Sequence, residues 1–210
     1  MRSAADVKHS YTSGARRLAT RSMTGLARTR VTPNVLTASG VTLCIVASVL
    51  VWFENRNEIL FYWLGAAVFV LGSLLDILDG ALARESGKGT PFGAFLDSTT
   101  DRVGECFMLG SIALVFARHD RLWAVGVAFA AVAGSLLVSY TRARAEALGL
   151  KGDVGIGSRA ERVVVITAGL VLAPWGVLPW AITLLAATVW LTVGQRVWSV
   201  RSQLRAQNIR

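Results

Sequence analysis

Hydrophobic residues follow one another in long runs along this chain and do not recur at the spacing of a surface helix. Two runs, 35–53 and 122–141, contain no charged residue. A third uncharged run, 163–195, is long enough for two helices and is divided by Pro174 and Pro179. A helix of about 20 apolar residues crosses the hydrocarbon core of a bilayer. The pattern therefore predicts a protein that crosses a membrane several times.

The whole chain divides into six such segments with short connections, so we expect an all-α, polytopic membrane bundle of six transmembrane helices. The expected ranges are 33–53, 58–84, 91–118, 121–147, 159–174 and 177–203. The second and third segments differ from the others, because each carries acidic residues at the end nearest the loop that they share. Ionisable groups at membrane depth are costly and usually mark a functional site.

The region ahead of these segments is basic and amphipathic. Residues 11–29 interleave apolar side chains with arginines, which predicts a helix lying along the membrane surface. A disordered basic tail is the alternative. Residues 1–32 contain seven Lys or Arg and no short apolar core before a cleavage site, so we expect no signal peptide. The chain is thus expected to have an N-terminal amphipathic segment, 1–32, and one six-helix transmembrane catalytic domain, 33–210.

Composition and charge agree with a membrane protein. Of the 210 residues, 53% are hydrophobic and only 17% are charged. The formal net charge of +9 would also suit nucleic-acid binding, but the basic residues gather beside the predicted spans, where they set topology and contact anionic lipids. Eighteen Lys or Arg fall on one side of the predicted membrane and three on the other. We therefore expect the cell membrane as the location, with both termini and the acidic residues on the cytoplasmic side, and no nucleic-acid partner.

Four carboxylates at the shared end of the second and third segments form the candidate site. Asp76 and Asp79 are three residues apart, and Asp97 and Asp101 are four apart, so each pair shares a helix face. Such anions repel one another in a low-dielectric setting unless they are protonated or neutralised by cations. Because no His or Cys joins them, Mg²⁺ or Mn²⁺ is expected, with two ions sharing bridging carboxylates.

Glycine and arginine residues lie beside these acids. Gly80 follows the second acid and Gly93 precedes the third by one turn, and both allow a ligand to approach the backbone closely. Arg84 lies one turn past Gly80 and carries a guanidinium that matches phosphate oxygens. The alternatives are structural: tight helix packing for the glycines and anchoring at the membrane interface for Arg84.

Eight residues at fixed spacing resemble the complete signature of the CDP-alcohol phosphotransferase family. They are Asp76, Asp79, Gly80, Ala83, Arg84, Gly93, Asp97 and Asp101. The six-span pattern extends the similarity over nearly the whole chain. The resemblance implies an enzyme of phospholipid biosynthesis that joins a CDP-activated lipid to a polar alcohol and releases CMP. It also implies a homodimer.

The resemblance implies roles for individual residues. Asp76, Asp79 and Asp97 would hold the metals with help from Asp101, and Asp101 would also be the general base. Glu105, one turn further along, either supports the site or packs against a polar neighbour. The residues that would border the CDP-lipid are Thr32, Pro33, Asn34, Val35, Gly80, Ala83, Arg84, Thr90 and Gly93. A plain helix start with Pro near its first position is the alternative for the segment 32–35.

Basic residues on the cytoplasmic side exceed what topology needs, which predicts a phosphorylated polyol as acceptor. Segments 139–146 and 159–162 and the Gln195-Arg196 pair resemble the phosphatidylinositol-phosphate synthases. The donor would then be a CDP-diacylglycerol-type lipid and the acceptor inositol phosphate. By this similarity, the residues that would bind the acceptor's phosphate are Arg142, Arg159 and Arg196.

This chain differs from that branch at two positions, and two alternative functions remain. The branch usually has Lys where this chain has Arg142 and Pro where it has Ala160. Within the family, a phosphatidylglycerophosphate synthase that uses glycerol 3-phosphate is the alternative, because its acceptor also carries a phosphate. From another class, a cation transporter is the alternative, since acids inside a membrane also mark ion paths. A transporter predicts acids spread through the membrane depth, whereas these gather at one end.

Overall fold

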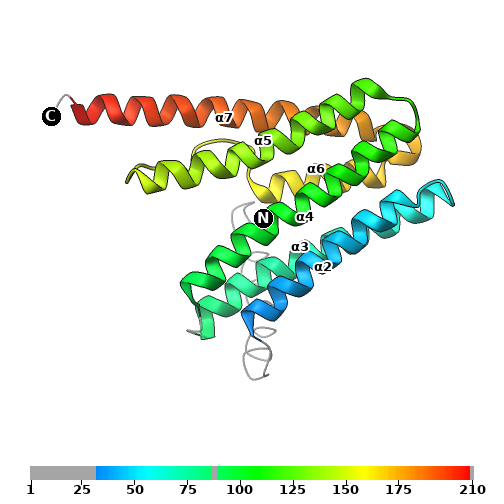
Figure 1. The fold of residues 1–210 in the computed structure, drawn as a ribbon, viewed down its shortest axis with the longest axis horizontal. Coiled ribbons are helices and arrows are strands. Elements are labelled where there is room, and N and C mark those ends of the chain that lie inside the picture. The colour runs from blue at the N-terminus through cyan, green and yellow to red at the C-terminus, as the bar shows by residue number, and fades with distance from the viewer. Residues whose placement is uncertain (1–31, 87–88, 209–210) are drawn as a thin grey trace, which may run out of the picture.

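The computed structural model describes residues 32–86 and 89–208, and this part of the chain is all-helical (Figure 1). Its α-helices are α2 (Pro33–Trp52), α3 (Glu58–Ser86), α4 (Pro91–Arg118), α5 (Leu122–Ala147), α6 (Arg159–Val171) and α7 (Leu178–Asn208), and a short 3-10 helix, η1 (Ala173–Trp175), follows α6. The predicted segments begin within one residue of these helices. The two differ most where η1 replaces the end of the fifth segment and where α7 continues to Asn208. The predicted N-terminal amphipathic helix lies outside the described residues.

The helices that begin beside the acids have their starts defined by local sequence. Pro33 and Pro91 occupy first-turn positions, where a missing N–H costs nothing. Thr90 caps α4 by accepting a hydrogen bond from the Gly93 N–H at 2.9 Å. Ser158 caps α6 in a reciprocal capping box with Glu161. These caps fix where each helix starts and therefore where its first side chains lie.

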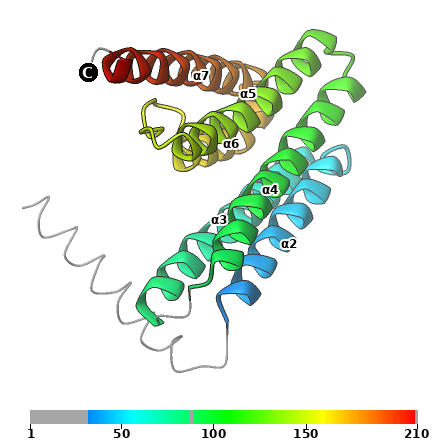
Figure 2. The same cartoon turned by 60° about the vertical axis from the view of Figure 1, so that its left-hand side comes forward.

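The helices form two groups that diverge toward one end (Figures 1 and 2). In one group α2 packs against α3 and α4, and in the other α7 packs against α5 and α6. The groups are joined by contacts of α4 with α5 and of α3 with α6. The α2–α3 contact is close: a Cβ atom on Gly72 would lie 2.8 Å from the carbonyl oxygen of Gly40. Small residues permit such backbone approach between membrane helices.

Four helices of the described chain are long and apolar enough to cross a membrane. They are Pro33–Trp52, Glu58–Gly80, Leu122–Ala147 and Leu178–Gln207. Helix α6 has 13 residues, which is about 20 Å at 1.5 Å per residue and shorter than the hydrocarbon core. Helix α4 carries Asp97 and Asp101 in its first half. A multi-pass membrane protein is thus confirmed, while the number of six full crossings stays a prediction.

A buried ion pair closes the bundle at the end away from the acids. The Glu54 side chain is 4% exposed, and its Oε1 lies 3.1 Å from Nη1 of Arg118. Arg118 also donates to the carbonyl oxygen of Trp52 at 2.8 Å, and its guanidinium lies 3.8 Å from the centre of the Trp52 ring. Cation–π contacts of this kind add to the ion pair. These contacts join the end of α4 to the turn between α2 and α3.

Candidate active site

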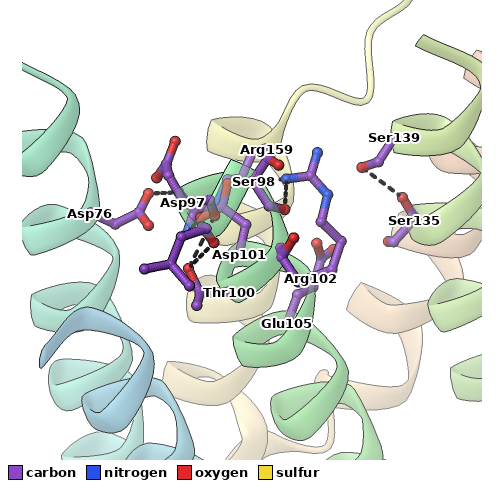
Figure 3. Close-up of polar contacts among 12 residues, drawn as sticks. Asp76, Asp97, Ser98, Thr100, Asp101, Arg102, Glu105, Ser135, Ser139 and Arg159 are labelled. Atoms are coloured by element: carbon purple, nitrogen blue, oxygen red, sulfur yellow. Dashed lines mark hydrogen bonds and ion pairs between the residues drawn. The ribbon is translucent and has the colours of Figure 1, made fainter. Parts of the chain in front are cut away.

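Three of the four predicted metal ligands converge between α3 and α4. One carboxylate oxygen from each of Asp76, Asp97 and Asp101 lies within 4.8 Å of the other two. Asp76 comes from α3 and is buried, whereas the other two lie one turn apart on α4 and are half-buried (Figure 3). Their spacing of four residues places both on one face of α4. Three carboxylates gathered in this way are a suitable oxygen ligand set for a hard divalent cation.

Asp79 lies beside this group of three and not within it. The Thr37 hydroxyl of α2 donates a hydrogen bond to Asp79 Oδ2. The other oxygen, Oδ1, is buried and has no hydrogen-bond partner among the described residues. A buried carboxylate oxygen without a donor is costly unless a cation contacts it. Asp79 and Asp97 line the same cavity, so the residues fit a cation held between them.

Arginine side chains contact two of the acids from either side. Arg159, the first residue of α6, forms an ion pair with Asp76, and its Nη2 lies 2.7 Å from Asp101 Oδ1. Arg102 Nη1 lies 3.4 Å from the other oxygen of Asp101. Figure 3 shows Asp76, Asp101 and Arg159 gathered between α3, α4 and α6, with Arg102 on the other side of α4 beside Ser98. The Arg159 guanidinium therefore offsets part of the charge of the acids and joins the two helix groups.

A cavity of about 430 Å³ opens next to Asp79 and Asp97, between the starts of α2 and α4 and the end of α3. The residues predicted to border the CDP-lipid that line it are Pro33, Asn34, Gly80, Thr90 and Gly93. A Cβ atom on Gly93 would lie 3.1 Å from the Thr90 hydroxyl and 3.3 Å from the Asn34 side-chain oxygen, so glycine suits this position.

The other residues predicted to border the CDP-lipid are placed differently. Thr32 and Val35 are exposed and do not line the cavity. The side chains of Ala83 and Arg84 lie outside the part of the structure that is described. Their expected contacts therefore stay predictions.

A second cavity, of about 840 Å³, lies between α3 and α6 and is almost entirely apolar. Its wall includes Leu74 and Ile77 of α3 and Val164 of α6, which are 49%, 59% and 65% exposed. Arg159 forms one end of this wall. The same side chain thus borders the acids and an apolar space large enough for lipid chains.

The three arginines predicted to bind the acceptor's phosphate occupy three different environments. Arg159 contacts the acids, as described above. Arg142 is exposed on α5, and its Nε lies 2.9 Å from Glu146 Oε1. Arg196 is buried on α7 and donates from Nε to the Val154 carbonyl at 2.8 Å and from Nη1 to the Val138 carbonyl. The three guanidinium groups therefore have different partners in the structure.

Two residues close to the site were given no firm role by the sequence. Glu105 forms a bidentate ion pair with Arg162, with Nε–Oε1 and Nη2–Oε2 distances of 2.7 and 2.9 Å. The structure thus contains the contact of Glu105 with a polar neighbour, and Glu105 also lines a small cavity together with Asp101 and Arg159. Thr37, which holds Asp79, was missed altogether. The available signal was its position one turn beyond Pro33, where a polar side chain interrupts an apolar helix.

Comparison with known proteins gives one consistent family. The family model for CDP-alcohol phosphatidyltransferases matches residues 30–198. A phosphatidylinositol phosphate synthase of Mycobacterium marinum is 39% identical over 184 residues, which cover 84% of this chain and 76% of that protein. An archaetidylinositol phosphate synthase of Pyrococcus horikoshii is 36% identical over 182 residues, which cover 85% of this chain and 88% of that protein.

Solved structures agree with this family. The crystal structure of Mycobacterium tuberculosis phosphatidylinositol phosphate synthase with CDP-DAG bound has a TM-score of 0.77 and 34% identity, covering 88% of this chain and 94% of that chain. The same enzyme in complex with manganese and citrate also has a TM-score of 0.77 and 34% identity, covering 87% and 88%. The chain matches the family model over most of its length and shares more than a third of its residues with curated members, and it therefore belongs to the CDP-alcohol phosphatidyltransferase family of membrane enzymes.

Proposed function

We propose that this enzyme transfers a phosphatidyl group from CDP-diacylglycerol to inositol phosphate, giving phosphatidylinositol phosphate and CMP. One observation carries the proposal: the acidic site lies between a cavity lined by polar groups beside Asp79 and Asp97 and an apolar cavity beside Arg159. A lipid with a nucleotide headgroup needs both environments next to the reacting phosphate. The names of the relatives in the previous subsection support the same donor and acceptor.

The donor lipid is proposed to lie across α3. Its cytidine and pyrophosphate occupy the cavity at the starts of α2 and α4, where Asn34, Thr90 and Gly93 offer hydrogen-bonding groups and close backbone approach. At least one of its acyl chains follows the apolar cavity between α3 and α6. Burying apolar chains against apolar side chains is favourable in proportion to the area covered.

The acids are proposed to hold two Mg²⁺ or Mn²⁺ ions. The unpartnered Oδ1 of Asp79 and the group of Asp76, Asp97 and Asp101 supply the carboxylate oxygens. When bound, such ions would offset the negative charge that develops on the departing CMP. The solved structure of the Mycobacterium tuberculosis relative in complex with manganese supports the use of a divalent cation.

Asp101 is proposed to be the general base. The hydroxyl oxygen of the acceptor attacks the phosphorus that carries the diacylglycerol, the bond from that phosphorus to the CMP oxygen breaks, and the hydroxyl proton moves to Asp101. Arg159 and Arg102 contact the Asp101 carboxylate and orient it. Proton transfer to a positioned carboxylate needs this kind of fixed orientation.

The acceptor's phosphate is proposed to bind the predicted arginines. Arg159 contacts it from the side of the acids, and Arg142 and Arg196 contact it from α5 and α7. Arg196 uses two nitrogens for backbone carbonyls, while its Nη2 makes no hydrogen bond within the described chain. Arginine binds phosphate through several parallel donors. Nη2 of Arg196 and the exposed side chain of Arg142 would add donors to those of Arg159.

The proposed arrangement in the cell has six membrane crossings, an amphipathic helix within residues 1–32, and a single catalytic domain over 33–210. Both termini and the acids face the cytoplasm, because the basic residues are concentrated on that side of the predicted membrane. A homodimer is proposed from the family resemblance.

A direct test offers the purified protein CDP-diacylglycerol, Mg²⁺ and either radiolabelled inositol phosphate or radiolabelled glycerol 3-phosphate. We expect label in lipid only with inositol phosphate, together with an equal amount of released CMP. Incorporation of glycerol phosphate alone would replace the acceptor by that of a phosphatidylglycerophosphate synthase. Absence of CMP release with either acceptor, in a folded protein, would contradict the transferase itself.

A further inference from the structure

The start of α6 is held by an ion pair that lies deeper than the acids. Arg162 is 4% exposed, and its guanidinium forms the bidentate pair with Glu105 of α4 described above. The remaining nitrogen, Nη1, donates to the Gly157 carbonyl oxygen at 2.9 Å. Bidentate geometry and a third hydrogen bond fix the direction of the guanidinium as well as its position. Arg162 thus ties α4 to the connection between α5 and α6.

Helix α7 holds the same residue, Gly157, through its N–H group. The Gly157 N–H donates to Thr192 Oγ1 at 2.9 Å. A Cβ atom on Gly157 would lie 2.8 Å from that oxygen, so there is no room for a side chain. Gly155 has a φ of +122°, and its Cβ would lie 2.3 Å from Thr192 Cγ2. Glycine is required here both for the backbone conformation and for the close approach to α7.

The held peptide immediately precedes the residues that reach the site. Ser158 caps α6 and Arg159 follows it, so the position of Gly157 sets where Arg159 begins. Arg159 and Arg162 are three residues apart and share a face of α6. Their partners Asp101 and Glu105 are one turn apart on α4, which gives two successive arginine–carboxylate contacts between these helices. Glu105 and Arg159 also line one small cavity with Asp101.

We propose that Glu105, Arg162 and Thr192 are positioning residues that hold Gly157 and thereby place Arg159 against Asp101. None of the three contacts the proposed substrates; they act through the peptide that starts α6. The inference rests on the proposed function in one respect, namely that Arg159 binds the acceptor's phosphate. Loosening the hold displaces Arg159 and weakens acceptor binding, whereas the donor cavity at α2 and the start of α4 is unaffected.

Three conservative variants test this hold. Glu105→Gln removes the negative charge and one of the two acceptors of the bidentate pair, and Arg162→Lys keeps the positive charge and loses the bidentate geometry. Thr192→Val removes the acceptor for the Gly157 N–H together with the hydrogen bond from the Thr192 hydroxyl to the Thr188 carbonyl of its own helix. We expect the KM for inositol phosphate to rise about tenfold in Glu105→Gln, a typical loss for one charged hydrogen bond. Smaller increases are expected in the other two variants. The KM for CDP-diacylglycerol should change much less, because Arg159 forms only one end of the apolar cavity and does not line the cavity at the starts of α2 and α4.

Amide hydrogen exchange provides a readout that does not depend on activity. Exchange at residues 155–161 should be faster in all three variants, because each variant weakens a contact that fixes Gly157 at the start of α6, and local opening of this segment then costs less free energy. Glu54→Gln is the matched control: it breaks a buried Glu–Arg pair at the opposite end of the bundle. It should lower the melting temperature as Glu105→Gln does, and leave both the exchange at 155–161 and the acceptor KM unchanged.

The outcomes separate the positioning role from the proposed function. If Glu105→Gln only lowers the melting temperature, with unchanged exchange and acceptor KM, the pair is merely structural and the inference fails. If exchange rises in the variants but the wild-type enzyme does not use inositol phosphate, the hold on Gly157 stands and the proposed acceptor fails. If the KM values for donor and acceptor rise together, the site is disturbed as a whole and the specific link to Arg159 is overturned.

Discussion

At the scale of single residues, the four acids of the signature are not equivalent. One carboxylate oxygen from each of Asp76, Asp97 and Asp101 lies within 4.8 Å of the other two. Asp79 accepts a hydrogen bond from Thr37, and its other oxygen is buried without a partner in the described chain. The sequence predicted that Asp97 and Asp101 share a face of one helix, because residues four apart in a helix point in similar directions. It did not predict this difference, because the direction of a side chain depends on the neighbouring helix. For Asp79 that neighbour, α2, lies some 40 residues away in the chain.

Thr37→Val tests the hold on Asp79. The variant keeps the shape of the side chain and removes the hydroxyl that fixes the carboxylate. We expect kcat/KM to fall about tenfold and the Mg²⁺ concentration for half-maximal activity to rise, since a supporting contact of a metal ligand is lost. Thr42→Val is the control, because the Thr42 hydroxyl bonds only to the Ala38 carbonyl of its own helix. Equal metal requirements in the two variants would argue against a role for Thr37.

Asp101→Asn tests the proposed general base. Asparagine keeps the size of the side chain but cannot accept the hydroxyl proton, so we expect kcat to fall by about 10²–10⁴. CMP release from CDP-diacylglycerol with saturating inositol phosphate measures the loss. The variant should still bind the donor lipid, as followed by its protection against thermal unfolding. Activity above about a tenth of the wild type would exclude Asp101 as the base.

At the scale of helices, the site depends on how closely α2 approaches α3. The hydrophobic runs predicted where these helices lie, because about 20 apolar residues are needed to cross a bilayer. They did not predict the contact of Gly40 with Gly72 or the contacts of α7 with the α5–α6 connection. Those contacts join residues that are distant in sequence. Their donors and acceptors are often backbone groups, which every residue has and which the sequence therefore does not distinguish.

Gly72→Ala tests the α2–α3 contact. The added methyl group would lie 2.8 Å from the Gly40 carbonyl oxygen and 2.9 Å from Cys44 Sγ, so α2 must move away from α3. We expect a destabilisation of about 1–3 kcal/mol, typical of overpacking, and reduced activity because Thr37 moves away from Asp79. Gly110→Ala on α4 is the matched control, since its Cβ would meet nothing within 4 Å. Thermal unfolding in detergent compares the two variants.

At the scale of the whole molecule, an apolar cavity lies between α3 of one helix group and α6 of the other. Ala168 lines this cavity, and Ala168→Phe fills part of it. We expect a raised KM for long-chain CDP-diacylglycerol and a smaller change for a short-chain analogue, because fewer methylenes compete for the space. Ala187→Phe adds the same bulk to the exposed face of α7, away from the cavity, and serves as the control. Similar effects of both variants would show that the cavity does not hold the lipid.

Because the wall of this cavity is exposed at the side of the helix bundle, we expect the enzyme to respond to the concentration of the donor lipid within the membrane. Leu74, Ile77 and Val164 in this wall are exposed, so we expect a lipid to enter from its own leaflet with its tails still among other tails. Lifting one methylene into water costs about 0.8 kcal/mol, and a pair of ordinary fatty chains would cost tens of kcal/mol by that measure. Entry of the lipid from within the leaflet would avoid this free-energy cost. Turnover should therefore follow the mole fraction of donor in the leaflet and fall when inert phospholipid dilutes it, at constant total donor in the sample.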